Sequence, residues 1–374
     1  MMECDGFHDG GGGAGAKNRG MRYAVAGERD AVDPEFLEAL QTALAAAGFL
    51  HTVDAEEAAL VVNLIDAASP KPFRRKSRGT FVAAVAELDA VPADPLRETY
   101  PFLVRSLANV ALCYVEGRGV WFTTMERGSY LVEGADPDML AGSVVERLSP
   151  LARSHLVIDN EFRPDLELEL WDGDEHTEDI AECGRRLKAL GLLPAPFPIE
   201  KILDERDLRH VKRLYGLGGL SYGNLSARKD EKRFWMSASG VDKSQLHEVG
   251  RDILLVSDYD ERHRRIVLSV PPGIEPRRVS VDAIEHWMIY RENPEVGAIL
   301  HVHAWVEGAA ATDINYPCGT EELARSVAEL VAAAPDPACA VVGLRNHGIT
   351  ATGETTNEIL SRLEPRLLRQ VPMT

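Results

Sequence analysis

The segment Ala298-Ile-Leu-His-Val-His-Ala304 is the most informative stretch of this sequence. Its apolar start predicts a buried β-strand. Side chains alternate between the two faces of a strand, so His301 and His303 should point the same way, roughly 6–7 Å apart. Two imidazoles at this spacing could bind one metal ion. A His-x-His pair alone is more often ordinary surface or core histidine, so the interpretation depends on the motifs that accompany it.

A third histidine follows in Leu344-Arg-Asn-His-Gly348. The apolar segment 340–344 predicts a second strand, which ends in a polar turn that carries His347. Three histidines from two strand ends could hold one divalent metal and leave one coordination position open. An open position is typical of catalytic rather than structural metal sites.

The composition limits the classes of function. The 374 residues favour two domains, and 45% hydrophobic with 27% charged residues is ordinary for a globular protein. A net charge of −18 argues against nucleic acid or an acidic membrane surface as a partner, because both need a basic surface. No apolar run reaches the roughly 18–20 residues that span a bilayer. Five scattered cysteines indicate free thiols, and with no visible signal peptide they predict a cytoplasmic protein.

The first half of the chain predicts a small α/β domain over residues 21–171, after a disordered glycine-rich tail at residues 1–20. It contains neither a Gly-x-Gly-x-x-Gly motif nor a Walker loop, so no nucleotide site is predicted. The basic residues from Lys71 to Arg78 follow a predicted strand and indicate a solvated loop, with a phosphate-binding loop as the alternative. The expected strands lie at 22–26, 59–65, 79–85, 111–115, 120–124 and 165–170, and the expected helices at 34–47, 101–110 and 136–148.

An acidic stretch marks the predicted boundary between the domains. Residues 159–182 carry eleven acidic side chains and one basic side chain, Arg163. The second domain is expected to cover residues 172–374. It opens with predicted helices at 177–190 and 205–215, separated by a proline break at 194–198.

Six motifs follow one another in this second domain, and in this order and spacing they resemble the class II aldolase/adducin family. That family includes fuculose-phosphate aldolase and ribulose-phosphate 4-epimerase, and the resemblance runs from about Thr177 to the C-terminus. The motifs are Gly218-Gly-Leu-Ser-Tyr-Gly-Asn-Leu-Ser-Ala-Arg228, Phe234-Trp-Met-Ser-Ala-Ser-Gly240, Ser280-Val-Asp-Ala-Ile-Glu-His286, His301-Val-His303, Tyr316-Pro-Cys-Gly-Thr-Glu-Glu-Leu323 and Asn346-His-Gly348.

The resemblance implies a fold, a metal and an assembly. The fold is a three-layer α/β/α domain whose central sheet is mainly antiparallel, and the assembly is a homo-oligomer, usually a C4 tetramer with sites between subunits. His301, His303 and His347 would bind a divalent metal. Zn²⁺ is the expected ion, with Mn²⁺ or another divalent ion as alternatives.

Residues on one side of the histidines are expected to bind an anionic substrate. The tight turn and side-chain amide of Gly-Asn-x-Ser-x-Arg suit an anionic oxygen, and by resemblance Asn224 binds the substrate's phosphate or carboxylate. Ser239 and Gly240 offer hydroxyl and amide donors. Ser280 can cap the helix that runs to about residue 292, and helix N-termini attract anions. Taken singly, each of these residues is equally explained as a turn or a cap.

Asp282 is the predicted catalytic residue. It lies nineteen residues before His301, where by resemblance the aldolases carry a catalytic glutamate and the epimerases an aspartate. In an aldolase-like mechanism the metal polarises a carbonyl and the carboxylate moves the proton; in an epimerase-like one, the aspartate can join the metal. A surface aspartate that favours a helix N-terminus is the alternative. Glu285, one turn further on, is a weaker candidate.

The sequence departs from the family in places that bear on the reaction. The segment between His303 and Tyr316 is much shorter than in the sugar-phosphate aldolases, and twenty-seven residues follow His347. In these regions the relatives place tyrosines, or acid–base groups, that a neighbouring subunit contributes. Tyr222 and Tyr316 are not secure equivalents, and the N-terminal domain is another possible source. Val281 stands where phosphate-using relatives have a second serine, which removes one hydroxyl donor.

The predicted function is a metal-dependent lyase of carbohydrate metabolism that makes or breaks a carbon–carbon bond next to the carbonyl of a small substrate. Decarboxylation, epimerisation and dehydration are alternatives, because all can share a stabilised enolate. A non-catalytic scaffold resembling adducin is an alternative of another class. The presence of all three histidines favours the enzyme.

Overall fold

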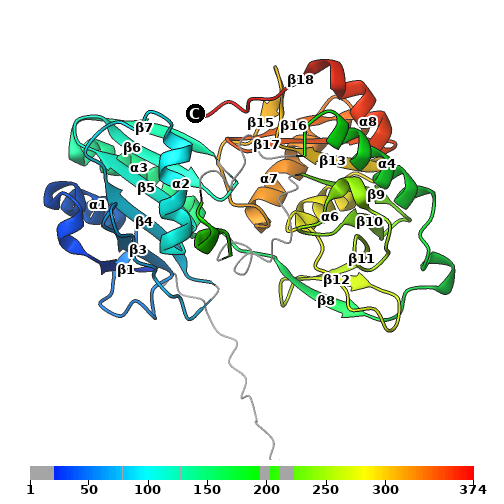
Figure 1. Cartoon of the computed structure of the whole chain (residues 1–374), viewed down its shortest axis with the longest axis horizontal. Coiled ribbons are helices and arrows are strands. Elements are labelled where there is room, and N and C mark those ends of the chain that lie inside the picture. Colours follow the sequence, from blue (N-terminus) through cyan, green and yellow to red (C-terminus); the bar gives the residue numbers. More distant parts are fainter. Residues whose placement is uncertain (1–20, 78, 127, 194–202, 210–222) are drawn as a thin grey trace, which may run out of the picture.

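The computed structural model describes residues 21–77, 79–126, 128–193, 203–209 and 223–374. In Figure 1 the N-terminal and C-terminal halves form two neighbouring bodies, each built around one large sheet. Residues 205–209 are helical, as predicted. The predictions that lie outside the described residues are the tail 1–20, Arg78 of the basic loop, the break 194–198, the rest of the helix 205–215, and residues 218–222 of the glycine-rich turn, Tyr222 included.

The N-terminal body contains a seven-stranded sheet in the order β2-β1-β3-β4-β5-β6-β7. Neighbours from β2 to β5 run parallel, whereas β5, β6 and β7 are antiparallel. The strands expected at 111–115 and 120–124 are therefore confirmed as an antiparallel pair, and so is the α/β class. The strands are β1 Arg22–Gly27, β2 Leu50–His51, β3 Leu60–Leu64, β4 Phe81–Glu87, β5 Val110–Val115, β6 Gly119–Thr124 and β7 Ser129–Glu133.

Helices cover both faces of this sheet. Helices α1 (Pro34–Ala46) and α3 (Pro137–Ala152) bury their apolar side chains against one face, and α2 (Pro95–Ser106) packs against the other. Each helix begins with a proline after an aspartate whose side chain caps the first turn.

The predicted position of the second helix is wrong at both ends. Helix α2 begins six residues before the expected start at Pro101, because the Asp94 side chain accepts a hydrogen bond from the backbone N–H of Arg97. It ends at Leu107, which adopts a left-handed conformation. Val110, predicted as helical, begins strand β5 instead.

The C-terminal body contains a nine-stranded sheet in the order β15-β16-β17-β13-β9-β10-β11-β12-β8. Only the two edge pairs, β15 with β16 and β12 with β8, are parallel, so the expected mainly antiparallel sheet is confirmed. Strands β14 and β18 form a separate pair. The bounds are β8 Asp159–Arg163, β9 Asn224–Arg228, β10 Phe234–Ser237, β11 Ile253–Asp260, β12 Arg265–Ser269, β13 Ala298–Val302, β14 Trp305–Val306, β15 Ala310–Ala311, β16 Val341–Leu344, β17 Gly348–Gly353 and β18 Leu367–Leu368.

Two pairs of helices enclose this sheet. Helices α6 (Ala283–Glu292) and α7 (Glu321–Ala332) pack together, and Ser226 of β9 and Thr350 of β17 direct their side chains toward α6. Because side chains alternate along a strand, the intervening residues face the opposite layer, where α4 (Glu175–Ala189) packs with α8 (Thr356–Leu363). Among the described residues, no helix has both the length and the apolar character needed to cross a bilayer.

The connection between the bodies differs from the expected one. Strand β8 precedes the predicted domain boundary at residue 172 but pairs with β12 of the C-terminal sheet. The strand predicted at 165–170 is wrong, since Leu168–Leu170 forms a short 3₁₀ helix. Leu166 and Leu170 are buried while Leu168 is 68% exposed, so the alternating leucines follow a helical turn rather than a strand.

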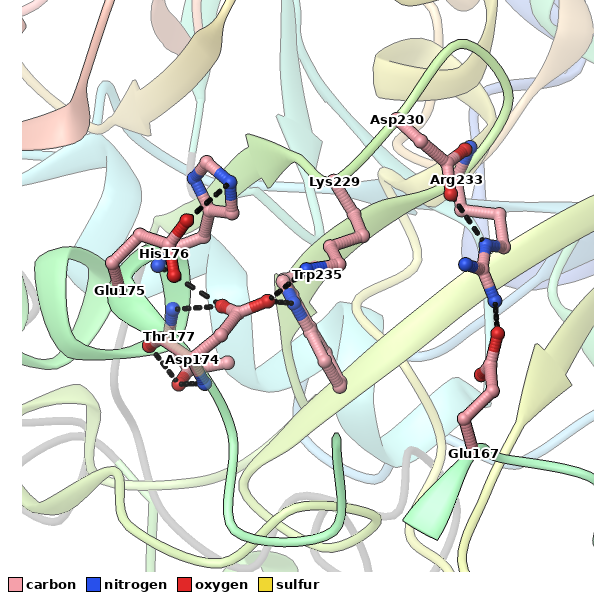
Figure 2. Close-up of polar contacts among 9 residues, drawn as sticks. All are labelled: Glu167, Asp174, Glu175, His176, Thr177, Lys229, Asp230, Arg233 and Trp235. Carbon is pink, nitrogen blue, oxygen red and sulfur yellow. Dashed lines mark hydrogen bonds and ion pairs between the residues drawn. The ribbon is translucent and has the colours of Figure 1, made fainter. Parts of the chain in front are cut away.

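A polar network then fixes this connection onto the C-terminal sheet (Figure 2). Asp174 caps α4 through Oδ1, which accepts hydrogen bonds from the backbone N–H groups of His176 and Thr177 at 3.0 and 3.2 Å. Its Oδ2 accepts from Trp235 Nε1 and lies 2.9 Å from Lys229 Nζ. Both carboxylate oxygens of this partly buried aspartate are therefore satisfied by the fold.

Candidate metal centre

Three histidines from two strand ends meet in the C-terminal domain. His301 lies in β13, His303 follows its last residue, and His347 occupies the turn between β16 and β17. One ring nitrogen of each histidine lies within 4.8 Å of the other two. The Nε2 atoms of His303 and His347 are 3.1 Å apart. His301 and His347 are buried and His303 is partly exposed, so the group can be reached from the side of His303.

The environment of His301 fits a metal ligand. Its Nδ1 is 3.0 Å from the carbonyl oxygen of Ile349, which can only accept, so Nδ1 carries the proton. Nε2 is then an unprotonated nitrogen, and it is buried without a hydrogen-bond partner. Burial lowers the pKa of His301, which favours the neutral imidazole that metals require. Together, three imidazole nitrogens form a donor set compatible with a divalent metal.

Asp282 lies next to this group and is not the surface aspartate of the alternative interpretation. It is 6% exposed and occupies the N-cap position of α6, but its side chain makes no capping hydrogen bond. Its Oδ2 accepts from Asn224 Nδ2 at 2.6 Å, and Oδ1 is buried without a hydrogen-bond partner. Asn224 is the register partner of His301 on the neighbouring strand. The sheet thus places the carboxylate beside the histidines.

Glu285 contacts the histidine group indirectly. The hydroxyl of Thr350 donates to Glu285 Oε1 at 2.6 Å and lies 3.3 Å from His301 Nδ1. Burial and, second, the charge of Asp282 raise the pKa of Glu285 to about 8. At neutral pH this side chain therefore favours the protonated form, which suits a residue that orients His301 rather than one that removes a proton.

The predicted anion-binding residues come from two segments that lie side by side. Ala238 forms an isolated bridge with Val279, which places Ser239 and Gly240 beside Ser280. Ser280 is buried, and Ser239 and Gly240 are partly exposed. The prediction that Ser280 caps the following helix is wrong, because the N-cap residue of α6 is Asp282. The binding of an anion by these residues and Asn224 stays a prediction.

Sequence reasoning missed a lysine in this region. Lys243 follows the Ser239-Gly240 pair by three residues and is only 3% exposed. Burial lowers the pKa of Lys243 to about 8, and the charge of Asp282 acts in the opposite direction. The position of Lys243 three residues after a predicted anion-binding turn was the signal in the sequence that could have identified it. Its cationic form offers a positive charge beside Asp282.

Two further residues near the histidines were also missed. Cys318 belongs to one of the quoted motifs but had no assigned role, and its Sγ is 3.5 Å from His347 Nε2. Its backbone N–H donates to Oε1 of Glu126 at 3.0 Å. Glu126 belongs to the N-terminal domain, 192 residues earlier, and no motif in the sequence pointed to it.

The domains pack closely at this place. Ile314 and Tyr316 of the C-terminal domain pack against the core of the N-terminal domain. Gly128, directly before β7, approaches the histidine turn so closely that an added Cβ would lie 2.7 Å from the carbonyl oxygen of Asn346. A side chain at this position would push the two domains apart.

Part of the C-terminal domain is similar to a known protein family. The profile described as Class II Aldolase and Adducin N-terminal domain matches residues 208–313. The resemblance to the class II aldolase/adducin family that was drawn from the six motifs is therefore confirmed over this segment. His301 and His303 lie inside the matched segment, whereas His347 and Glu126 lie outside it.

Curated relatives match a similar share of the chain. Methylthioribulose-1-phosphate dehydratase of Pseudomonas aeruginosa is 37% identical over 93 residues, which is 24% of this chain and 40% of the relative. The enzyme of the same name from Xanthomonas campestris pv. campestris is 36% identical over 88 residues, 24% of this chain and 35% of the relative. The chain therefore spans at most about two fifths of the length of these relatives.

Solved structures were also compared. The aldolase II superfamily protein from Pseudomonas syringae has a TM-score of 0.34 and 18% identity, covering 54% of this chain and 75% of that chain. YgbL from Klebsiella pneumoniae has a TM-score of 0.34 and 16% identity, covering 51% and 84%. Similarity at this level carries no argument about the site.

Proposed function

We propose that this chain is a metal-dependent lyase that removes water from a small anionic substrate next to a carbonyl group. The observation that carries this function is the convergence of His301, His303 and His347 beside the buried Asp282. The names of the relatives favour dehydration over the carbon–carbon cleavage expected first. We infer Zn²⁺ as the resident ion, with Mn²⁺ as the alternative.

The residues of the site have separate tasks in this reaction. A divalent ion held by the three histidines would act as a Lewis acid toward the substrate carbonyl. Asp282 takes the proton from the carbon next to that carbonyl, since its Oδ1 is buried without a partner. Asn224 holds the carboxylate through Oδ2 and leaves its own Oδ1 for a substrate hydroxyl or a water. Lys243 and the Ser239–Gly240 turn bind the substrate's anionic group.

Carbon–carbon cleavage is the second candidate function. It uses the same ion and the same base, and the Ser280-Val281 pair favours it. Val281 is 38% exposed and offers no hydroxyl to a substrate phosphate, unlike the second serine it replaces. A non-phosphorylated hydroxy-carbonyl acid would then be cut into two smaller carbonyl compounds instead of losing water.

The assembly and location belong to the same proposal. We infer a homo-oligomer, with a tetramer as the expected form, which light scattering after size exclusion would measure. A place in the carbohydrate metabolism of the cytoplasm agrees with the four described cysteines, all of which are free thiols.

The first experiment measures bound metal per chain. Unsubstituted protein, His301→Ala and the control His263→Ala are incubated with Zn²⁺ or Mn²⁺, dialysed and analysed for metal. His263 contacts only a surface network with Asp260, so its loss should leave the site intact. We expect about one ion per chain in the unsubstituted protein and the control, and background in His301→Ala.

The second experiment follows the reaction itself. The metal-loaded protein is incubated with methylthioribulose 1-phosphate, and mass spectrometry distinguishes loss of water from cleavage into two fragments.

The two experiments together decide between the candidates. If the unsubstituted protein binds neither Zn²⁺ nor Mn²⁺, the lyase is wrong and a non-catalytic scaffold becomes the better explanation. Metal binding with fragment products would favour the second candidate.

A further inference from the structure

The N-terminal domain brings a carboxyl group to the edge of the histidine site. Glu126 lies between β6 and β7, and its Oε1 accepts the backbone N–H of Cys318 at 3.0 Å. The thiol of Cys318 is in turn 3.5 Å from His347 Nε2. A single residue of the C-terminal domain therefore touches both Glu126 and a predicted metal ligand.

The electrostatics of the region agree with this placement. Burial and the charge of Asp282 both raise the pKa of Glu126, against hydrogen bonds that lower it. Burial, followed by the charges of Asp282 and Glu126, also raises the pKa of Cys318. Glu126 therefore favours its protonated form more than an ordinary glutamate does, chiefly because it is buried.

The contact that presents Glu126 is part of the fold. Gly128 leaves no room for a side chain against Asn346, and Ile314 and Tyr316 pack into the N-terminal core. Glu126 as a whole residue is partly exposed. It is therefore held by a packed interface and keeps some contact with solvent.

Within the described residues of the C-terminal domain, the segment where the relatives place their acid–base groups is short. Residues 303–316 form only two strands of two residues each, β14 and β15, with short turns. Glu285, a buried carboxyl group near Asp282, accepts a hydrogen bond from the hydroxyl of Thr350, which also lies 3.3 Å from His301 Nδ1. A β-elimination needs both a base for the proton and an acid for the leaving hydroxyl.

We propose that Glu126 is the general acid of this site, supplied by the N-terminal domain of the same chain. This role rests on the proposed dehydration. Asp282 removes the proton from the carbon next to the carbonyl, and the electrons of that C–H bond form a C=C bond. The C–O bond on the following carbon breaks, and its oxygen takes the proton of Glu126 and leaves as water. Proton exchange with solvent then returns Asp282 to its carboxylate form and Glu126 to its protonated form.

Glu126→Gln tests this role without removing the contact to Cys318. The glutamine oxygen can still accept the backbone N–H, but the side chain can no longer donate an acidic proton. Glu133→Gln, an exposed glutamate at the end of β7, is the matched control. Metal-loaded proteins are incubated with methylthioribulose 1-phosphate in D₂O. Loss of water, deuterium uptake at the carbon next to the carbonyl, and metal per chain are measured.

The expected results separate the two proton transfers. Glu126→Gln should keep its metal and its deuterium uptake while losing water at least about 100-fold more slowly, the low end for a general acid. Glu133→Gln should match the unsubstituted protein, and Asp282→Asn should lose both deuterium uptake and dehydration.

Other results would overturn the role of Glu126. Dehydration by Glu126→Gln at the unsubstituted rate would exclude the acid and leave the proposed function standing. Loss of the metal, or of deuterium uptake together with dehydration, would show that Glu126 only supports the structure. If the unsubstituted protein takes up no deuterium and loses no water, the proposed function and the acid both fail.

Discussion

Two aspartates occupy the same position in two helices and have opposite surroundings. Asp174 at the start of α4 accepts hydrogen bonds at both oxygens, from two backbone N–H groups, Trp235 and Lys229 (Figure 2). Asp282 at the start of α6 makes no capping bond, accepts one hydrogen bond from Asn224 and leaves Oδ1 buried without a partner.

The difference indicates which aspartate stabilises the fold and which fits the role of base in the proposed reaction. A satisfied buried carboxylate contributes to stability, whereas an unsatisfied one costs free energy that must be offset elsewhere. The helix N-cap position alone does not reveal which role an aspartate has. The number of hydrogen-bond donors that reach it from other elements does.

Asp282→Asn should have the largest effect on activity and little effect on stability. Loss of a general base lowers kcat by about 10²–10⁴-fold. The free energy of unfolding should stay the same or rise, because an unsatisfied buried carboxylate oxygen is removed. An activity assay and urea unfolding measure the two effects. A clear loss of stability with normal activity would make Asp282 a structural residue like Asp174.

Asp174→Ala should show the reverse pattern. The free energy of unfolding should fall by about 2–4 kcal/mol, because a helix cap is lost and the buried donors of Trp235 and Lys229 lose their acceptor. The folded fraction should keep its specific activity at low temperature. Glu175→Gln is the control, since that side chain is 80% exposed and next in sequence. An equal destabilisation of both variants would contradict the importance of the network.

Thr350→Val should weaken metal binding without removing it. Thr350 connects Glu285 with His301, and residues that orient a metal ligand typically contribute 10–100-fold to affinity, about 1.4–2.8 kcal/mol. Competition with a chelator measures the affinity. Thr352→Val is the control. It removes a buried hydroxyl two residues away, which donates to the carbonyl oxygen of Pro337 and not to Glu285. If both variants bind metal equally well, the connection through Thr350 has no function.

The smallest expected effect is on the pH dependence of stability. Burial raises the pKa of Asp174, but the hydrogen bonds from Lys229 and Trp235 outweigh it and hold the pKa below its ordinary value. The carboxylate's contribution is then fully present above about pH 4, the unfolded value, and is lost as the pH falls through the lower folded value. The difference in unfolding free energy between the unsubstituted protein and Asp174→Asn should therefore shrink below about pH 4. A constant difference in urea unfolding would contradict this.

Local patterns in the sequence predicted much of the fold. The apolar runs that became β3, β4 and β13 and the amphipathic segments that became α1, α3 and α4 were found, because their periodicity is local. The errors occurred where local signals conflicted. Pro101 suggested a helix start but lies inside α2, and the alternating leucines at 166–170 form a turn.

The sequence by itself determined the family resemblance and the grouping of the three histidines, because their motifs are short and their spacing along strands is regular. Only the tertiary structure decided which groups surround them. The lack of a cap at Asp282, the burial of Lys243 and the arrival of Glu126 from another domain all depend on contacts between distant segments. Such contacts arise when sheets and helices pack together. The local hydrophobic periodicity of the sequence predicts these elements but does not predict which distant residues meet.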